Sequence, residues 1–371
     1  MKSCLFPGKA IVLSPIRQLA IALERVPRSS QNQKGLSLVE LMIAVTIGLI
    51  ILATLTVVFS NGSNARRELE KSGSMLENGH YALAMLNDDL SQAGNYGELS
   101  VPTGTTDLPC STAVSDWAAS LAIPVHGSNQ GDLSIPCVSR KANTDAIFIQ
   151  RASTCIAGTA GCAAMVANAA YLQVSGCGDE YLTTPFVLAI NSGNPYTLKA
   201  IQLPGGVGQQ PTCQAAGTAP VRYFYRSIYY VDSNNILWRL DVNAGSTATP
   251  PGTPVQIASN VENMQLEYGI DSSGDGAPDT FSSTPAATDW PNVVGVRISL
   301  LVLAGNSTSG YQDAKSYVFG DVCSLPPGST TCPVPYAANA PIIRSTTDQA
   351  YKRHVYTSYV SFINPVGRRE Q

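Results

Sequence analysis

Hydrophobic residues are concentrated in one long run near the N-terminus. Residues 36–59 are 24 consecutive positions among which Glu40 is the only charged residue. A helix of this length can cross the hydrocarbon core of a bilayer, which is about 30 Å thick. The run is too long for an ordinary secretory signal, and no pair of small residues typical of a cleavage site follows it. The pattern therefore predicts a membrane-spanning helix with one carboxylate near its start.

The hydrophobic pattern changes after residue 59 but remains helical. One apolar row recurs every seven residues, with a second row beside it: Leu69, Leu76, Leu83 and Leu90, then Leu86 and Ala93. Polar and charged residues occupy most of the other positions, which is typical of an amphipathic helix that buries one face. Gly94 follows as a C-terminal stop signal. We therefore expect residues 60–93 to continue the helix and to bury the leucine stripe against a sheet.

Beyond Gly94 the chain becomes rich in Gly, Pro, Ser and Thr, with short β-prone runs between turn residues. We expect a globular domain over residues 94–371 with strands near residues 146–151, 171–174, 185–190, 222–231, 236–242, 261–270, 293–303 and 355–363. Turn residues 232–235 predict a hairpin between the fourth and fifth of these strands, and a longer hairpin is expected between the sixth and seventh. Residues 95–143 show little periodicity and are predicted to form a long loop. The expected fold class is α+β, with an antiparallel sheet laid over the long helix.

Charge is distributed unevenly between the N-terminus and the rest of the chain. The formal net charge of −3 includes +5 from residues 1–35, so residues 36–371 carry −8. Basic residues before a membrane helix tend to stay in the cytoplasm, which places the later residues on the exported side. The acidic main part gives no support for a nucleic-acid partner, because such proteins usually show a basic footprint.

The cysteines follow the same division. Of the nine cysteines, Cys4 lies in the basic leader and eight lie beyond the apolar run, where an even number in an exported region favours disulfides. No C-x-x-C pair occurs, which argues against a structural zinc site or a thioredoxin-like motif. Short spacings favour the pairs Cys155–Cys162 and Cys323–Cys332. The remaining four, Cys110, Cys137, Cys177 and Cys213, are expected to pair in an order that their spacing leaves open.

The start of the apolar run carries a recognisable motif. The residues from Lys34 to Glu40, KGLSLVE, resemble the processing site of type IV prepilins: a basic residue and Gly, a hydrophobic first mature residue, and Glu at mature position five. The resemblance implies that a membrane-embedded prepilin peptidase cuts between Gly35 and Leu36 and N-methylates Leu36. It also implies that Glu40 meets the protonated N-terminus of a neighbouring subunit when helices pack. A carboxylate in a membrane is costly unless it is paired, so such a contact would set the register of assembly.

Three further segments extend this resemblance to PilW-type minor pilins of type IV pilus systems: LNDDLSQAGNYG, VENMQLEYGIDSSGDGAPD and YKRHVYTSYVSFIN. The resemblance implies a non-enzymatic structural subunit that helps to initiate pilus assembly at or near the tip, with roles in adhesion and twitching motility. It implies a single-pass protein of a Gram-negative inner membrane with a periplasmic domain, which later enters the surface pilus. The partners would be prepilin peptidase, other minor pilins, the major pilin, the inner-membrane assembly platform, membrane lipid before assembly and a tip adhesin.

Two other interpretations fit parts of the pattern. A minor pseudopilin of a type II secretion system, of the J type, shares the processing site and the helix, although this chain is large for that class. A signal-anchored periplasmic enzyme or ligand-binding module would keep an uncut leader and would be indifferent to Glu40. The mass of the mature N-terminus distinguishes this last interpretation from a pilin.

One loop has the spacing of a cation site. In DSSGDGAPD, the residues Asp271, Ser273, Asp275 and Asp279 match ligand positions of a calcium loop and Gly276 matches its sharp turn, but Ser282 stands where a bidentate Glu belongs. A solvated hairpin turn explains the same residues, so calcium is a possible cofactor and no other is expected.

Other candidates have ordinary explanations. The three histidines, His80, His126 and His354, are far apart and lie in no metal or catalytic motif, and no G-x-S-x-G nucleophile elbow occurs. Residues 204–210, PGGVGQQ, lack the phosphate-loop pattern and are interpreted as a loop. The aromatic run from Tyr223 to Tyr230 could stack on a glycan or a base, but a half-buried strand explains it more simply.

Overall fold

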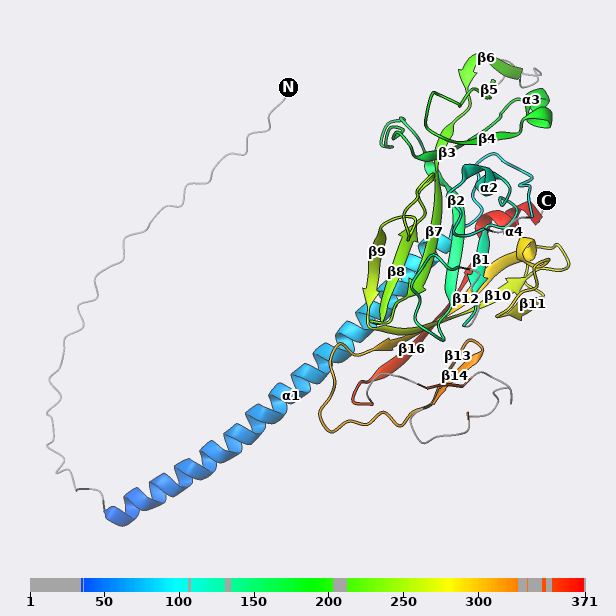
Figure 1. Cartoon of the computed structure of the whole chain (residues 1–371). Helices are drawn as coiled ribbons and strands as arrows, with labels where there is room; N and C mark the ends of the chain where they lie inside the picture. Colours follow the sequence, from blue (N-terminus) through cyan, green and yellow to red (C-terminus); the bar gives the residue numbers. More distant parts are fainter. Residues whose placement is uncertain are drawn as a thin grey trace, which may run out of the picture. The chain divides into compact units, whose positions relative to one another are not determined.

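The computed structural model describes residues 35, 37–105, 108–130, 135–202, 212–325, 332, 342–344 and 349–369. The predicted leader before Gly35, the first mature residue Leu36 and the loop at residues 204–210 lie outside the described residues. The chain divides into two units, residues 1–62 and residues 63–371, which are described separately. The elements are labelled in Figure 1.

The first element is the long helix α1, Leu38–Ser91, whose extent agrees with the predicted helix. Gly94, with a φ of 72°, follows its end, as expected of a helix stop. The predicted apolar stripe is only partly correct. Leu83, Leu86 and Leu90 are buried, but Leu69 and Leu76 are 72% and 46% exposed. The stripe is buried only where the strands reach the helix, so its first two leucines stay in contact with solvent.

The largest sheet has seven strands and is antiparallel. Its main path runs β1-β2-β7-β3-β4, and β8 pairs with both β7 and β9. The strands are β1 Val125–Ser128, β2 Ala146–Ile156, β3 Ala170–Val174, β4 Phe186–Ile190, β7 Val221–Val231, β8 Ile236–Asp241 and β9 Pro254–Ser259. The predicted hairpin between β7 and β8 is confirmed by their antiparallel register. Asn235 adopts a φ of 61° in its turn, where Asp232 accepts hydrogen bonds from the backbone N–H groups of Asn234 and Ile236.

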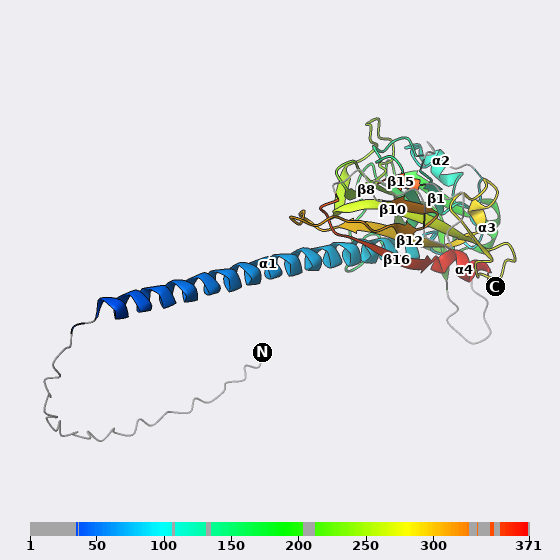
Figure 2. The ribbon, with the colours of Figure 1, turned by 90° about the horizontal axis from the view of Figure 1, so that it is seen from below.

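A second antiparallel sheet has the order β11-β10-β12-β16. Its strands are β10 Val261–Ile270, β11 Thr280–Ser282, β12 Val293–Leu303 and β16 Arg353–Ser361. The predicted pairing of β10 with β12 is confirmed. Figure 2 shows the second half of α1 beside β16. The sequence predicted a single antiparallel sheet over the helix. The structure instead divides the strands among separate sheets, so this part of the prediction is wrong.

Smaller elements complete the described chain. Two small sheets lie apart from the main ones. One pairs β5 Lys199–Gln202 with β6 Thr212–Thr218. The other contains β13 Tyr317–Phe319, β14 Val322–Leu325 and β15 Ile342–Arg344, and in it β15 runs parallel to β14. Short helices are α2 Val114–Ala118, α3 Gly178–Thr183, the 3-10 turn η1 Trp290–Asn292 and α4 Ile363–Arg369. The segment predicted as a long loop thus contains α2 and β1, and it buries Trp117 and Leu121.

Two hydrophobic cores lie on opposite faces of the seven-stranded sheet. On one face, Tyr229 and Ile147 join Leu86 of α1 and residues of the second sheet in the larger core. On the other face, Phe224 and Ile228 pack with the segment that carries Trp117. Strand side chains alternate between faces, so β7 contributes to both cores. The predicted α+β fold, with a long N-terminal helix and antiparallel sheets, is confirmed.

Four disulfides tie the loops. The structure pairs Cys155 with Cys162 and Cys323 with Cys332, the two pairs that their spacing favoured. The four cysteines whose pairing the sequence left open form the bonds Cys110–Cys137 and Cys177–Cys213. Cys110–Cys137 closes the segment between α1 and β2, so it holds a region with few strands of its own.

Candidate functional site

The predicted processing and assembly site lies at the start of α1. Glu40 is in the first turn, where the exposed N–H groups of a helix favour a negative charge. The backbone N–H of Leu41 donates to the carbonyl of Ser37 at 3.1 Å, which extends the helical pattern back toward Gly35. Within the described residues Glu40 is exposed and has no hydrogen-bond or ion-pair partner. Its predicted partner is the Leu36 amine of a neighbouring subunit, and Leu36 lies outside the described residues, so this contact stays a prediction.

The helix that follows Glu40 has the character of a membrane segment. It is long and apolar enough to cross a membrane, and its most apolar stretch is not buried within the structure. Large apolar side chains such as Leu52 and Phe59 are 63% and 80% exposed. The three threonines satisfy their hydroxyls locally by donating to helix carbonyls three or four residues earlier: Thr46, Thr54 and Thr56. This part of α1 therefore offers an apolar surface with no unpaired hydroxyl donor.

The second half of α1 is fixed to the sheets by polar contacts as well as by its leucines. Near its end, one Asp89 carboxylate oxygen accepts a hydrogen bond from Arg151 Nε at 2.6 Å and the other accepts one from the Tyr229 hydroxyl at 2.6 Å. Burial and the neighbouring Asp89 charge raise the pKa of Tyr229, so this hydroxyl keeps its proton and donates. The helix is thereby joined to β2 and β7 at one carboxylate.

Earlier in this half of the helix, Glu68 is the centre of a more exposed cluster. It pairs with Lys352 at 2.5 Å and with Lys71 at 2.9 Å, and it accepts a hydrogen bond from the Thr308 hydroxyl at 3.1 Å. The hydrogen bond from Lys352 comes first among the interactions that lower the pKa of Glu68 to about 2. Sequence reasoning missed this cluster, because Lys352 and Thr308 lie more than 230 residues from Glu68 in the chain.

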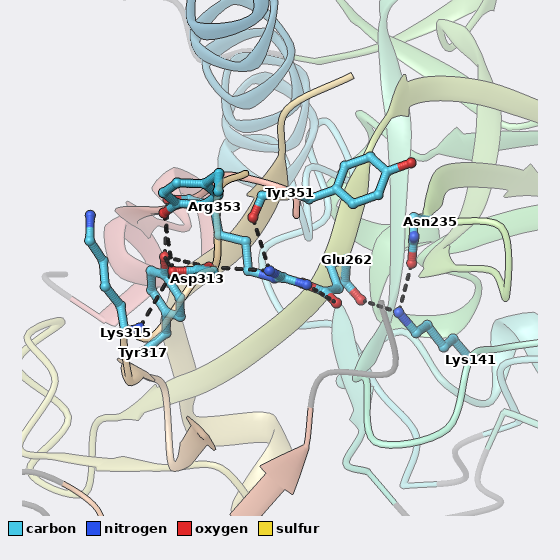
Figure 3. Close-up of polar contacts among 9 residues, drawn as sticks. Lys141, Asn235, Glu262, Asp313, Lys315, Tyr317, Tyr351 and Arg353 are labelled. Carbon is cyan, nitrogen blue, oxygen red and sulfur yellow. Dashed lines mark hydrogen bonds and ion pairs between the residues drawn. The ribbon is translucent and has the colours of Figure 1, made fainter. Parts of the chain in front are cut away.

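A second missed feature is a buried ionic network in the globular unit (Figure 3). Arg353 of β16 donates from Nε to Glu262 of β10 at 2.7 Å and from Nη1 to Asp313 at 3.1 Å. All three side chains are at most 4% exposed. The Tyr317 hydroxyl donates to Asp313 at 3.0 Å. The network joins two strands of one sheet to the segment before β13.

The pKa shifts in this network follow from burial and charge. Burial lowers the pKa of Arg353, but the hydrogen bonds and charges of Glu262 and Asp313 outweigh it and raise the pKa overall. Lys141 donates to the Asn235 side chain at 2.7 Å and to the backbone carbonyl of Glu262 at 2.9 Å, and desolvation lowers its pKa. Buried, mutually paired charges of this kind have no access to a substrate, so we interpret the network as structural. The sequence signal was an acid at the start of one strand and a base at the start of another, Glu262 in β10 and Arg353 in β16.

The predicted calcium loop lies between β10 and β11, and its carboxylates bind the loop itself. Asp271 is 1% exposed and accepts from the backbone N–H groups of Gly274 at 2.6 Å and Gly276 at 2.9 Å. Asp279 accepts from the N–H groups of Ser272 and Ser273. Asp275 accepts from Ala277. Calcium binding here stays a prediction.

The remaining candidates are spread over the fold. His80 and His354 flank Tyr356, and His126 stacks on Trp290 at a ring-centroid distance of 4.3 Å. Across the described residues, no group of three or more His, Cys, Asp or Glu side chains is arranged to hold a metal. The aromatic run divides by face: Phe224 enters a core, while Tyr223 and Tyr225 are half-buried on the opposite face of β7.

Comparisons with known proteins agree with the arrangement of this helix and these sheets. Residues 30–56 match the model of the prokaryotic N-terminal methylation motif, and residues 228–364 match the model of type IV pilus-assembly protein W. The second match begins in β7 and includes β8, β10, β12 and β16. No curated protein matches the chain.

A solved structure of a type IV-like pilin from Thermus thermophilus is similar, with 11% identity over 81% of this chain and 98% of that one and a TM-score of 0.35. The resemblance that the sequence motifs indicated is confirmed by the two family models. The chain carries a prepilin methylation motif at the start of its long apolar helix and a domain of the PilW type of type IV pilus-assembly proteins in its globular unit.

Proposed function

We propose that this protein is a minor pilin that helps to initiate type IV pilus assembly and resides at or near the pilus tip. The observation that carries the proposal is the order of features along one chain. A methylation motif precedes an apolar helix whose run of residues 36–59 has Glu40 as its only charge, and a PilW match follows in the globular unit. The PilW match favours a pilus subunit over a pseudopilin of a secretion system.

The proposed assembly step begins with cleavage between Gly35 and Leu36 by prepilin peptidase. Cleavage creates a protonatable amine at Leu36, which N-methylation leaves able to carry a charge. A carboxylate at the centre of a membrane helix costs about 2.5 kcal/mol or more, and less near the interface. Contact between Glu40 and the amine of a neighbouring subunit offsets this cost only in correct register. Glu40 thus favours assembly over the dispersed state in lipid.

The rest of the chain divides the remaining tasks. Residues 36–59 would anchor the subunit in the inner membrane and later form the fibre core. Residues 60–93 and 94–371 would form the periplasmic domain that contacts other minor pilins, the major pilin, the assembly platform or a tip adhesin. The basic leader and the four disulfides both support an exported globular domain.

The most direct test measures the mature N-terminus by mass spectrometry of the membrane-extracted protein. Cells with prepilin peptidase should yield a chain that begins with N-methyl-Leu36, and cells without it should yield the intact leader. An uncut Met1 terminus in peptidase-positive cells would reject the proposal and support a signal-anchored protein of another class.

The assembly role is tested by Glu40→Ala. We expect this variant to accumulate in the membrane at normal amounts but to be depleted about tenfold or more in sheared pili, the equivalent of a loss of about 1.4 kcal/mol or more in assembly free energy. Glu77→Ala is the matched control, because Glu77 is an exposed glutamate of the same helix outside the apolar run. Equal recovery of both variants in pili would contradict the role of Glu40.

A further inference from the structure

Helix α1 leaves part of one sheet face uncovered. Side chains alternate between the two faces of a strand, so Tyr223, Tyr225 and Tyr229 lie on the same face of β7. Tyr229 lies under the helix, with its hydroxyl on Asp89, but α1 ends two residues later at Ser91. Tyr223 and Tyr225 therefore lie beyond the helix, where Tyr225 is opposite Arg151 of β2 and Tyr223 is opposite Tyr171 of β3. Figure 1 shows β2, β7 and β3 as neighbours.

A cavity of about 590 Å³ lies over this uncovered face. Its floor is formed by tyrosines of β3 and β7, and its walls by Gln92, by Arg151 of β2 and by the loop closed by the Cys155–Cys162 disulfide. The volume falls within the range of about 300–1,000 Å³ that is usual for small-molecule sites. The disulfide fixes the loop that forms one wall to the end of β2. The cavity therefore lies between hydrogen-bonded strands and a covalently closed loop.

The aromatic side chains form a continuous row across the strands. Tyr171 packs edge-on against Tyr223 with ring centroids 5.3 Å apart, and Tyr223 lies 4.5 Å from Tyr225. The guanidinium of Arg151 sits 4.6 Å from the centroid of Tyr225 and covers that ring. Tyr171 is only 2% exposed, whereas Tyr223 is half-buried. Tyr223 is thus the ring with a surface open to a ligand.

The polar side chains around this row can all donate hydrogen bonds. Arg151 uses Nε to bind Asp89, and its two terminal nitrogens have no hydrogen-bond partner among the described residues. The hydroxyls of Tyr223 and Tyr225 and the side-chain amide of Gln92 are equally without partners there. Desolvation raises the pKa of Tyr223, which keeps its hydroxyl protonated and able to donate. No carboxylate belongs to the cavity lining.

We propose that this cavity binds an acidic saccharide, with one sugar ring on Tyr223, its hydroxyls on Tyr225 and Gln92, and its carboxylate on Arg151. A sugar ring offers a C–H face for an aromatic ring and many acceptors for these donors. The terminal nitrogens of Arg151 form a fork that matches a carboxylate. The binding site belongs to the globular unit and does not depend on the assembly role.

Two other ligand classes fit the cavity less well. An extended peptide gains its affinity by adding a strand to a sheet edge, but β7 is an interior strand, with β2 on one side and β3 and β8 on the other, so it offers no free edge. A nucleic acid would have to approach a chain that carries −8 over residues 36–371, and the single arginine of the cavity does not form a basic patch.

The test titrates the full-length, detergent-solubilised protein with 3′-sialyllactose and with lactose by calorimetry. We expect saturable binding of sialyllactose, about tenfold tighter than lactose because lactose lacks the carboxylate, and weaker binding at high salt. Tyr223→Ala should weaken sialyllactose binding by about tenfold or more. Tyr81→Ala, which removes a 51% exposed tyrosine from α1, is the matched control and should bind like the parent.

A second variant separates charge recognition from folding. Arg151→Lys keeps a cation beside Asp89 but removes the fork, so it should reduce the preference for sialyllactose over lactose while the melting temperature stays close to that of the parent. The proposal is overturned by absence of saturable binding to either sugar at millimolar concentration. It is also overturned by unchanged binding in Tyr223→Ala, or by binding of an oligothymidylate or an acidic peptide without binding of sialyllactose.

Discussion

The two halves of α1 have similar secondary structure but opposite surroundings. In residues 38–59 the large apolar side chains are at least half exposed within the structure, whereas Ala82, Leu86 and Leu90 in the second half are completely buried. The first half has one acid, Glu40. The second half has many polar residues, and some of these, such as Asp89 and Glu68, bind the globular domain.

The difference shows that apolar content alone does not determine which helical residues a protein buries in its own core. An all-round apolar helix buries its surface in lipid or in other subunits, because no single face is adapted to one sheet. An amphipathic helix buries one stripe in its own domain. Polar residues on one face therefore mark the half of α1 that packs on its own domain. A half that is apolar on all faces has its surface available for lipid or for other subunits.

The largest effect on stability is expected when a leucine is replaced by alanine in the second half of α1, and the same change in the first half is its comparison. Leu86→Ala removes a completely buried side chain from the core between α1 and the sheets, so it should cost about 2–5 kcal/mol of unfolding free energy. Leu52→Ala, at a 63% exposed site, should change it by less than about 0.5 kcal/mol. Urea unfolding of the detergent-solubilised protein measures both. Equal losses would mean that the first half also packs on the domain.

The sequence predicted features that depend on neighbouring residues. The helix, its stop at Gly94 and the turn at Asp232–Asn235 depend on local periodicity and backbone preference, and the structure has all three. The motif from Gly35 to Glu40 is likewise local. These features could be recognised because each signal lies within one or two helical turns or a single hairpin.

Other features depend on contacts between distant residues. The division of the strands among separate sheets, the Cys177–Cys213 bond and the pairing of Glu262 with Arg353 all depend on segments that no local pattern connects. Strand β9 was missed for a different reason. It begins with a proline and pairs only with β8, so it is an edge strand with a weak β signal. The tyrosine cavity was missed because β3 and β7 are adjacent only in the fold.

A smaller effect is expected from glycines of α1. A Cβ at Gly79 would overlap the ring of Tyr356, which is 6% exposed and donates its hydroxyl to Met75, so the ring has little room to move. Gly79→Ala should therefore destabilise the protein by about 1–3 kcal/mol. Gly73→Ala meets nothing within 4 Å and should stabilise by about 0.5–1 kcal/mol through helix propensity. Circular dichroism during urea unfolding measures both, and a gain in both variants would contradict close packing at Gly79.

The smallest effect concerns Glu68, a partly exposed polar contact of the packed half. Its pKa is lowered to about 2 in the folded state, first by the hydrogen bond from Lys352 and then by that from Lys71. A lowered folded-state pKa gives stability that is present above the ordinary pKa of 4.5 and is lost as the pH falls toward 2. Glu68→Gln should therefore lower the melting temperature slightly at neutral pH, and the difference from the parent should vanish between pH 4.5 and pH 2. Solvent screening keeps the effect small, and salt should reduce it further.

Glu77→Gln controls for the change in helix charge. A difference between Glu68→Gln and the parent that persisted unchanged to pH 2 would show that the cluster acts through packing and not through charge.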